Sequence, residues 1–75
     1  MTKKHKRKFN HAGLAALRSK RGLTQTQLGE MCGADKSVVS HWETGRSAPR
    51  IDALILVADA LGVLVDDLYT TKRAA

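Results

Sequence analysis

The sequence has little of what several classes of protein require. Cysteine occurs once and the three histidines are scattered, so neither an intramolecular disulfide nor a metal-ligand set can be assembled. Three aromatic residues leave few rings to stack on unpaired RNA bases. The longest apolar run, residues 53–58, is far shorter than the roughly 20 residues that a membrane-spanning helix needs. We therefore expect no metal, no cofactor and no membrane contact, and a location in the reducing cytoplasm.

Acidic residues are also absent from the first 22 positions, which hold eight lysine or arginine residues. Residues 23–50 balance three bases with three acids, and residues 51–75 carry four aspartates against two bases. The net charge of +6 is thus concentrated at the N-terminal end. A surface with this polarity attracts a polyanion to its basic side. The length of 75 residues suits one small domain, which would bury only about 60% of its unfolded surface.

The most informative pattern is a pair of short helices joined at a glycine. Thr24 and Gln27 have the spacing of a capping box, which marks the start of the first helix. Gly33 stands where a residue with positive φ ends a helix. Gly29, one turn earlier, leaves room for the second helix to cross closely. The positions that share the inner face of this first helix are Leu28, Met31 and Cys32.

The second helix of the pair is expected over residues 36–44, with Asp35 as its cap and with Val39 and Trp42 turned inward. With 100° of rotation per residue, a polar stripe then lies on the opposite face. Its members are Lys36, Ser37, Ser40, His41 and Thr44. Only this face is free to reach another molecule.

Three further helices are expected around this pair. Asn10 caps a first helix that runs to about residue 20, and Gly62 ends another that begins near Arg50. A short last helix covers residues 65–70. The inner face of the helix before Gly62 is formed by Ile51, Leu54, Val57, Ala58 and Leu61.

The segment from Leu14 to Leu68, about three quarters of the chain, resembles the Cro/CI-type (Xre-like) helix-turn-helix family of phage and bacterial regulators. Six features match in order. They are GLTQ at 22–25, Gly29, Gly33, VSHWETG at 39–45, Pro49 and ADALGV at 58–63. Each feature is common alone, but the six together are a specific signal.

The resemblance implies an all-α, compact five-helix, lambda-repressor-like DNA-binding domain. On this basis we divide the chain into a basic N-terminal arm (1–9), the helix-turn-helix domain (10–70, with the motif at 25–44) and a C-terminal tail (71–75). The implied function is sequence-specific binding of double-stranded DNA, with the helix over residues 36–44 in the major groove. A bacterial or phage-encoded protein associated with the nucleoid is expected.

The polar stripe over residues 36–44 supplies the expected base contacts. Lys36 and Ser37 lie at the start of the helix and would reach deepest, and lysine can donate to guanine O6 or N7. Val38 lies at the edge of the stripe, where it can touch a thymine methyl group. Phosphate contacts are expected from the helix start at residues 24–25, from two arginines beyond the helix, and from the basic arm. These residues are Thr24, Gln25, Arg46, Arg50, Lys3, Lys4, Lys6, Arg7 and Lys8.

Two further expectations come from the resemblance. Arg18 and Glu43 match a pair that in many relatives forms a buried salt bridge between the first and third helices. Relatives also often form a two-fold dimer near the C-terminal end, where this chain departs from the family by placing leucine at 56 and 64. The expected dimer patch consists of Ile55, Leu56, Leu64 and Leu68. A homodimer would require a near-palindromic operator.

The sequence also bears on functions other than DNA binding. An enzyme is excluded because His41 and Glu43 point to different faces of one helix and no glycine-rich phosphate loop is present. A protein-interaction module remains open, because antitoxins that neutralise a partner use the same fold. The basic arm can also be interpreted as a solvated, disordered tail without a binding role. Among regulators, a repressor is favoured over an activator, because occlusion needs only tight binding.

Overall fold

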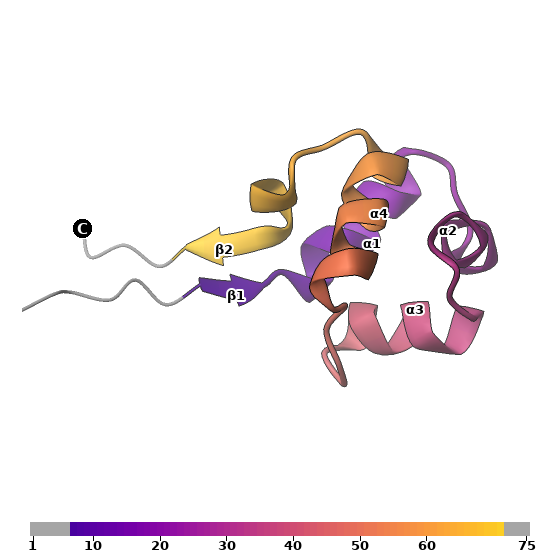
Figure 1. Cartoon of the computed structure of the whole chain (residues 1–75), viewed down its shortest axis with the longest axis horizontal. Helices are drawn as coiled ribbons and strands as arrows, with labels where there is room; N and C mark the ends of the chain where they lie inside the picture. Colours follow the sequence, from indigo (N-terminus) through magenta and orange to yellow (C-terminus); the bar gives the residue numbers. More distant parts are fainter. Residues whose placement is uncertain (1–6, 72–75) are drawn as a thin grey trace, which may run out of the picture.

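The structure is a computed structural model that describes residues 7–71. Most of it is helical: α1 (His11–Lys20), α2 (Gln25–Cys32), α3 (Lys36–Thr44) and α4 (Ile51–Leu61). A one-turn 3-10 helix, η1 (Val65–Leu68), follows α4, and two strands, β1 (Arg7–Phe9) and β2 (Tyr69–Thr71), pair with each other. Figure 1 shows this β1–β2 ribbon projecting from one side of the helical body. No helix within residues 7–71 is long and apolar enough to cross a membrane.

The β1–β2 ribbon corrects the expectation of an all-α fold with five helices. Residues 7–9 belong to the fold as a strand rather than to an N-terminal arm, and residues 69–71 form its antiparallel partner rather than a helix end and a tail. The register pairs Phe9 with Tyr69, and the amide of Asn10 donates to the carbonyl of Leu68 at 2.9 Å. Burial of Phe9, which is 8% exposed, fixes the ribbon to the helices.

The helix boundaries follow from local capping chemistry. The side chain of Asn10 accepts from the amide of Gly13 at the start of α1. At α2, the Thr24 hydroxyl accepts from the Gln27 amide at 3.0 Å and the Gln27 side chain accepts from the Thr24 amide at 2.8 Å, so the predicted capping box is present. Asp35 occupies the N-cap position of α3, although its side chain accepts no capping hydrogen bond from the described residues of that helix.

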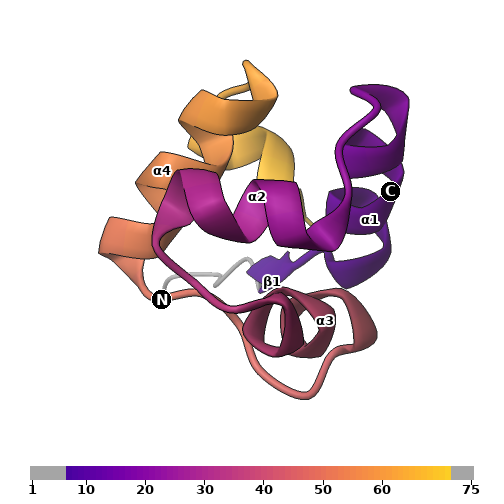
Figure 2. The ribbon, with the colours of Figure 1, turned by 90° about the vertical axis from the view of Figure 1, so that its right-hand side faces the viewer.

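Gly29 sets the distance between α2 and the turn that leads into α3. A Cβ atom added at Gly29 would lie under 3.0 Å from the carbonyl oxygen of Ala34. The turn itself passes through Gly33, which has a φ of 72° and ends α2. Figure 2 shows α2 lying across α3 with this short turn between them. The pair therefore packs more closely than any residue with a side chain at position 29 allows.

One core joins all the elements. The residues with 2% or less of their surface exposed are Leu14, Leu28, Val39, Leu54, Val57, Leu61 and Leu68. Two residues expected to be buried are instead exposed: Met31 at 51% and Ile51 at 66%. The inner face of α2 is centred between Leu28, Gly29 and Cys32, which turns Met31 toward solvent. Ile51 is the first residue of α4 and extends past the elements that cover the rest of that helix.

Leu68 is fully buried, so its expected place in an exposed dimer patch is wrong. The 3-10 turn of η1 directs this side chain into the core. The turn begins at Leu64, whose side chain has no hydrogen-bond acceptor and cannot act as a cap. Asp67 compensates in part, because its carboxylate accepts from the Leu64 amide at 2.9 Å.

Candidate nucleic-acid interface

One side of α3 faces solvent along its length and carries the polar stripe. Val39 and Trp42 are 0% and 5% exposed and hold the helix from behind. Figures 1 and 2 show α3 at an edge of the molecule, with the other helices on one side of it only. The stripe residues Lys36, Ser37, His41 and Thr44 are exposed, and Ser40 is half-buried.

The side chains of the stripe differ in the hydrogen bonds that they still offer. The Thr44 hydroxyl donates to the Ser40 carbonyl at 3.0 Å, so its proton is used within the helix and its oxygen is left to accept. Val38, at the edge of the stripe, is 36% exposed. Lys36 and Ser37 are exposed donors in the first turn of α3, and the lysine has the longer side chain.

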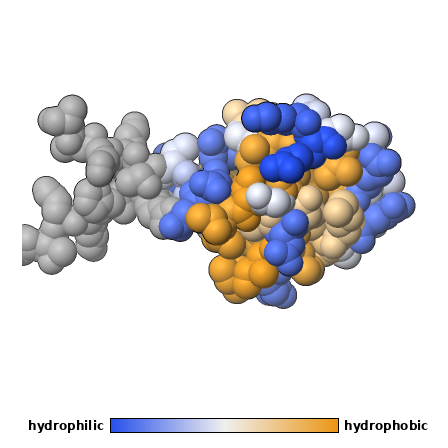
Figure 3. Space-filling model, turned by 90° about the horizontal axis from the view of Figure 1, so that it is seen from above, coloured by the Kyte–Doolittle hydropathy of each residue, from blue (hydrophilic) through white to orange (hydrophobic). Residues whose placement is uncertain are grey.

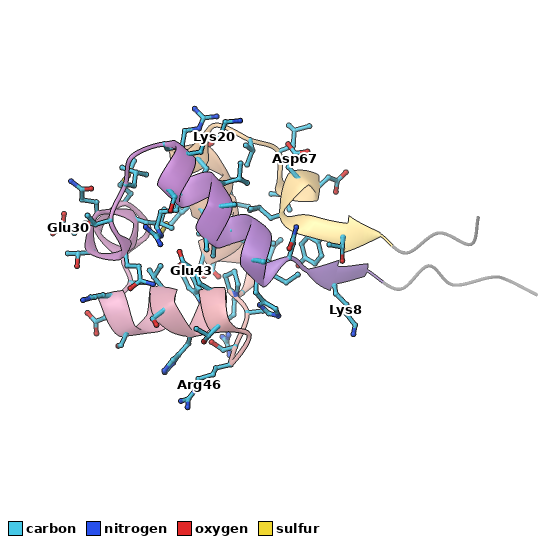
Figure 4. All side chains as sticks on the ribbon, turned by 180° about the vertical axis from the view of Figure 1, so that it is seen from behind. Lys8, Lys20, Glu30, Glu43, Arg46 and Asp67 are labelled. Carbon is cyan, nitrogen blue, oxygen red and sulfur yellow. The ribbon has the colours of Figure 1, made fainter. Side chains whose placement is uncertain are left out.

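An ion pair joins α1 to the far end of α3. Nε of Arg18 donates to Oε2 of Glu43 at 2.5 Å, and Nη2 donates to Oε1 at 3.1 Å. The two side chains are 16% and 6% exposed. The two hydrogen bonds make this a bidentate pair, which is stronger than a single contact. Figure 4 shows Glu43 on the inner side of α3, toward α1.

The ion pair keeps both partners charged. Burial alone would raise the pKa of Glu43, but hydrogen bonds from Arg18 and Gln25 and the charge of Arg18 outweigh it, so the pKa lies below its ordinary value. The hydrogen bond to Glu43 raises the pKa of Arg18, against the opposing effect of burial. Both groups therefore carry full charge at neutral pH.

Gln25 has a role that the sequence did not indicate. Its Nε2 donates to Oε1 of Glu43 at 2.9 Å, while Nη1 of Arg18 donates to the carbonyl of Leu23 at 2.8 Å. The network thus ties α1, the start of α2 and the end of α3 together. No local pattern links Gln25 to a residue 18 positions away, so only the fold reveals this contact. The amide group of Gln25 retains a second N–H donor for an external ligand.

The start of α2 offers backbone donors beside this network. The capping box uses the hydroxyl and the amide of Thr24, while the amides of Gln25 and Thr26 lie in the first helical turn outside it. Backbone donors at a helix start, together with the helix dipole, favour an anion there. Thr24 is therefore occupied by capping, and the neighbouring amides are the better anion ligands.

Positive side chains flank α3. Arg46 and Arg50 are both exposed, in the loop between α3 and α4, and Figure 4 shows Arg46 pointing away from the body on the side of α3. Lys20 projects from the opposite side of the molecule. Lys8 is exposed on β1, and of Arg7 the structure describes only the backbone. Lys3, Lys4 and Lys6 lie outside the described residues.

Apolar side chains are exposed on the outer side of α4 and just beyond it. Ile55 and Leu56 are 49% and 44% exposed, and Leu64 is 71% exposed. We call these three residues the C-terminal apolar patch. Figure 3 shows hydrophobic surface, interrupted by hydrophilic residues, on the side of the molecule where α4 lies. This side is separate from the polar stripe of α3.

Known proteins resemble this chain over most of its length. A family model described as "Helix-turn-helix" matches residues 14–68. The HTH-type transcriptional activator BcrR of Enterococcus faecalis is 33% identical over 60 residues, which are 80% of this chain. The match spans only 29% of the length of that activator.

Solved structures with the same fold include complexes with DNA. The P22 c2 repressor in complex with a synthetic operator is 28% identical, with a TM-score of 0.77 over 81% of this chain and 92% of that one. SinR, a master regulator for biofilm formation, was solved in complex with DNA. It is 29% identical, with a TM-score of 0.71 over 77% of this chain and 97% of that one.

Proposed function

Because the chain belongs to the Cro/CI-type (Xre-like) helix-turn-helix family of DNA-binding regulators, we propose that it binds double-stranded DNA sequence-specifically and regulates transcription. The observation that carries the proposal is the exposed polar stripe of α3, held from behind by Val39 and Trp42. An α-helix presented in this way fits the major groove, where each base pair offers a distinct set of donors and acceptors.

In this proposal α3 is the recognition helix and the stripe reads bases. Lys36 donates to guanine, and Ser37 follows it as a donor or acceptor. His41 can donate or accept, and Thr44 accepts because its proton is used within the helix. Ser40, which is half-buried, makes the shallowest contact.

Phosphate contacts then flank the stripe on two sides. The amides of Gln25 and Thr26, with the second amide proton of the Gln25 side chain, bind one phosphate. Arg46 and Arg50 bind the backbone beyond the other end of α3. Lys8 and the lysine and arginine residues at positions 3–7 add phosphate contacts outside α3. Contacts of this kind position the domain but do not select a sequence.

We further propose that the protein binds its operator as a homodimer through the C-terminal apolar patch, since three exposed large apolar residues favour a partner. Two-fold symmetry then requires a near-palindromic operator with half-sites about 34 Å apart. A repressor is the simpler assignment, because occlusion of a promoter needs only tight binding. On α2, Glu30 is the one acidic side chain available to contact polymerase, as an activator would.

The test is an unbiased selection of duplex DNA by the protein at fixed salt. An enriched palindromic motif is expected, and it yields the operator sequence, the symmetry and the half-site spacing together. Binding that matches an unrelated basic peptide on every duplex would overturn the proposal. That result would favour the protein-interaction reading, in which the same fold neutralises a partner, as an antitoxin does.

A further inference from the structure

The β1–β2 ribbon and the recognition helix meet at one residue, His11. Nδ1 of the His11 ring lies 3.0 Å from the carbonyl oxygen of Trp42, in the last turn of α3. The same ring packs edge-on against Phe9 of β1, with ring centroids 5.5 Å apart. His11 is half-buried at the first position of α1. One side chain thus contacts both the ribbon and the end of the helix that carries the stripe.

The hydrogen bond from His11 supplies a donor for a carbonyl of α3 that has no partner within the helix. The last four carbonyls of a helix have no partner within it, and Trp42 supplies one of these. The neighbouring carbonyl of His41 is satisfied by the amides of Gly45 and Arg46. A carbonyl oxygen can only accept, so Nδ1 must carry the proton. Of the two neutral tautomers of the ring, only the one protonated at Nδ1 can make this bond.

The ring also lies against the residue that ends α3. A Cβ atom at Gly45 would come within 3.3 Å of Cδ2 and 3.4 Å of Nε2 of His11. Gly45 has a φ of 87° and leads directly to Arg46, one of the proposed phosphate ligands. The imidazole therefore bonds to the Trp42 carbonyl and occupies the space where a side chain at position 45 would lie.

On the other side, the position of the imidazole depends on the pairing of the strands. Phe9 is 8% exposed and packs edge-on against Tyr69, its partner in β2, with centroids 6.0 Å apart. The ribbon is closed further by the Thr70 hydroxyl, which donates to the Lys8 carbonyl at 3.2 Å. A continuous set of contacts thus runs from β2 through Phe9 and His11 to α3.

We propose that His11 is a positioning residue for DNA binding, which braces the C-terminal end of α3 against the β1–β2 ribbon. The brace sets where Thr44 and Arg46 lie relative to the groove, so the affinity for DNA depends on strand pairing at the two ends of the domain. This inference rests on the proposed function. The new element is a link between the recognition helix and segments that make no base contact.

The test compares two substitutions at one position. His11→Ala removes the donor and the ring, whereas His11→Asn keeps an N–H donor at the place of Nδ1. Affinity for the selected duplex is measured by fluorescence anisotropy at a temperature where each variant is fully folded. His11→Ala, which loses both contacts, should bind about tenfold more weakly than the wild type. His11→Asn keeps the hydrogen bond but loses the ring contact with Phe9, so its affinity should lie between those of His11→Ala and the wild type. The matched control Val63→Ala trims a half-buried residue that packs on the core away from α3, and should leave affinity unchanged.

A second variant tests the dependence on the ribbon. Tyr69→Leu removes the ring that supports Phe9 and should weaken DNA binding in the same direction as His11→Ala. The proposal is overturned if fully folded His11→Ala binds like the wild type, or if fully folded Tyr69→Leu does. A His11→Asn variant as weak as His11→Ala would support the link to the ribbon, because it would show that the ring contact with Phe9 is needed.

The free protein supplies a readout that does not need DNA. Trp42 is the only tryptophan in the chain, so its fluorescence and the amide resonance of Gly45 report on this end of α3. Both should shift in His11→Ala and return toward the wild type in His11→Asn. If the wild type selects no duplex, the proposed function fails, yet these signals still decide whether the brace exists. Unchanged signals in His11→Ala would eliminate it.

Discussion

At the scale of single residues, the proposed base contact of Lys36 and the proposed phosphate contact of Arg46 predict different losses of DNA binding. Lys36→Ala removes a base contact and should cost about 1–3 kcal/mol on the selected duplex while relaxing one base position. Arg46→Ala removes a phosphate contact, so it should weaken binding to all sequences alike and reduce the salt slope by about one unit. Both are measured by titration of matched and mismatched duplexes at several salt concentrations.

Lys20→Ala is the control for loss of a positive charge, because Lys20 projects from the side of the molecule opposite Arg46. It should change neither the sequence preference nor the salt slope by a comparable amount. If Lys36→Ala and Arg46→Ala give the same pattern, the division between base and phosphate contacts is wrong.

Gly29 permits a prediction about stability. A Cβ there would press on the Ala34 carbonyl oxygen, a backbone atom that cannot rotate away. Such overpacking lowers the free energy of unfolding by about 1–3 kcal/mol, whereas the better helix propensity of alanine raises it by only about 1 kcal/mol. Gly29→Ala should therefore lower the free energy of unfolding in urea. Thr26→Ala, at an exposed position of the same helix, should be neutral or stabilising, and equal stability of the two variants would contradict the steric argument.

At the scale of elements, the network of Arg18, Glu43 and Gln25 links three helices and predicts a dependence on acid. The pKa of Glu43 is lowered in the folded protein, so its contribution to stability is present above the ordinary glutamate pKa, about 4.3, and is lost as the pH falls through the lowered value. The free energy of unfolding should drop over this range in the wild type.

Glu43→Gln removes the titrating group and leaves Arg18 without its charge partner. Breaking a buried pair in this way costs about 3–5 kcal/mol, and the acid-dependent drop should be smaller in the variant. Urea denaturation between pH 3 and pH 7 measures both effects, with moderate salt to hold screening constant. A wild type and a variant with parallel pH profiles would assign the acid sensitivity to the other carboxylates instead.

How much of these elements the sequence predicts depends on the range of the interactions that form them. The capping box at Thr24 and the glycine end of α2 involve neighbours in the chain, and both are present as predicted. The burial of Val39 and Trp42 follows from helical periodicity alone. The partnership of Arg18 with Glu43 came from the resemblance to a family, since nothing local joins residues 25 positions apart.

The features that the sequence did not predict arise from pairing across the whole domain. Each strand of the ribbon has three residues, too few for an alternating pattern to appear, and the cross-strand hydrogen bond of Thr70 spans 62 positions. The helical spacing predicts a buried Met31, but the close approach at Gly29 rotates the buried face of α2 away from it. The contacts of Gln25 and His11 likewise exist only after α1, α2 and α3 have met.

At the scale of the whole molecule, the surface proposed to bind DNA and the surface proposed to form a dimer lie on different elements. The polar stripe and its flanking arginines belong to α3 and the loop beyond it, whereas exposed leucine and isoleucine side chains gather on α4 and the segment that follows. A domain of this size buries a modest fraction of its surface, so the proposed association of two copies would add stability that one core cannot supply. The proposed dimer would also double the number of DNA contacts.

The proposed dimer can be tested without disturbing the core, because Leu64 is 71% exposed. Leu64→Gln and Leu56→Gln remove apolar contact area and add no charge that would repel DNA. Each should weaken binding to a full palindromic duplex by about tenfold while leaving the affinity for an isolated half-site unchanged, since the loss falls on the contact between copies. Mass measured on the full site should shift from two copies toward one. Met31→Gln, an exposed apolar position on α2, should retain two copies, and equal behaviour of all three variants would place the contact elsewhere.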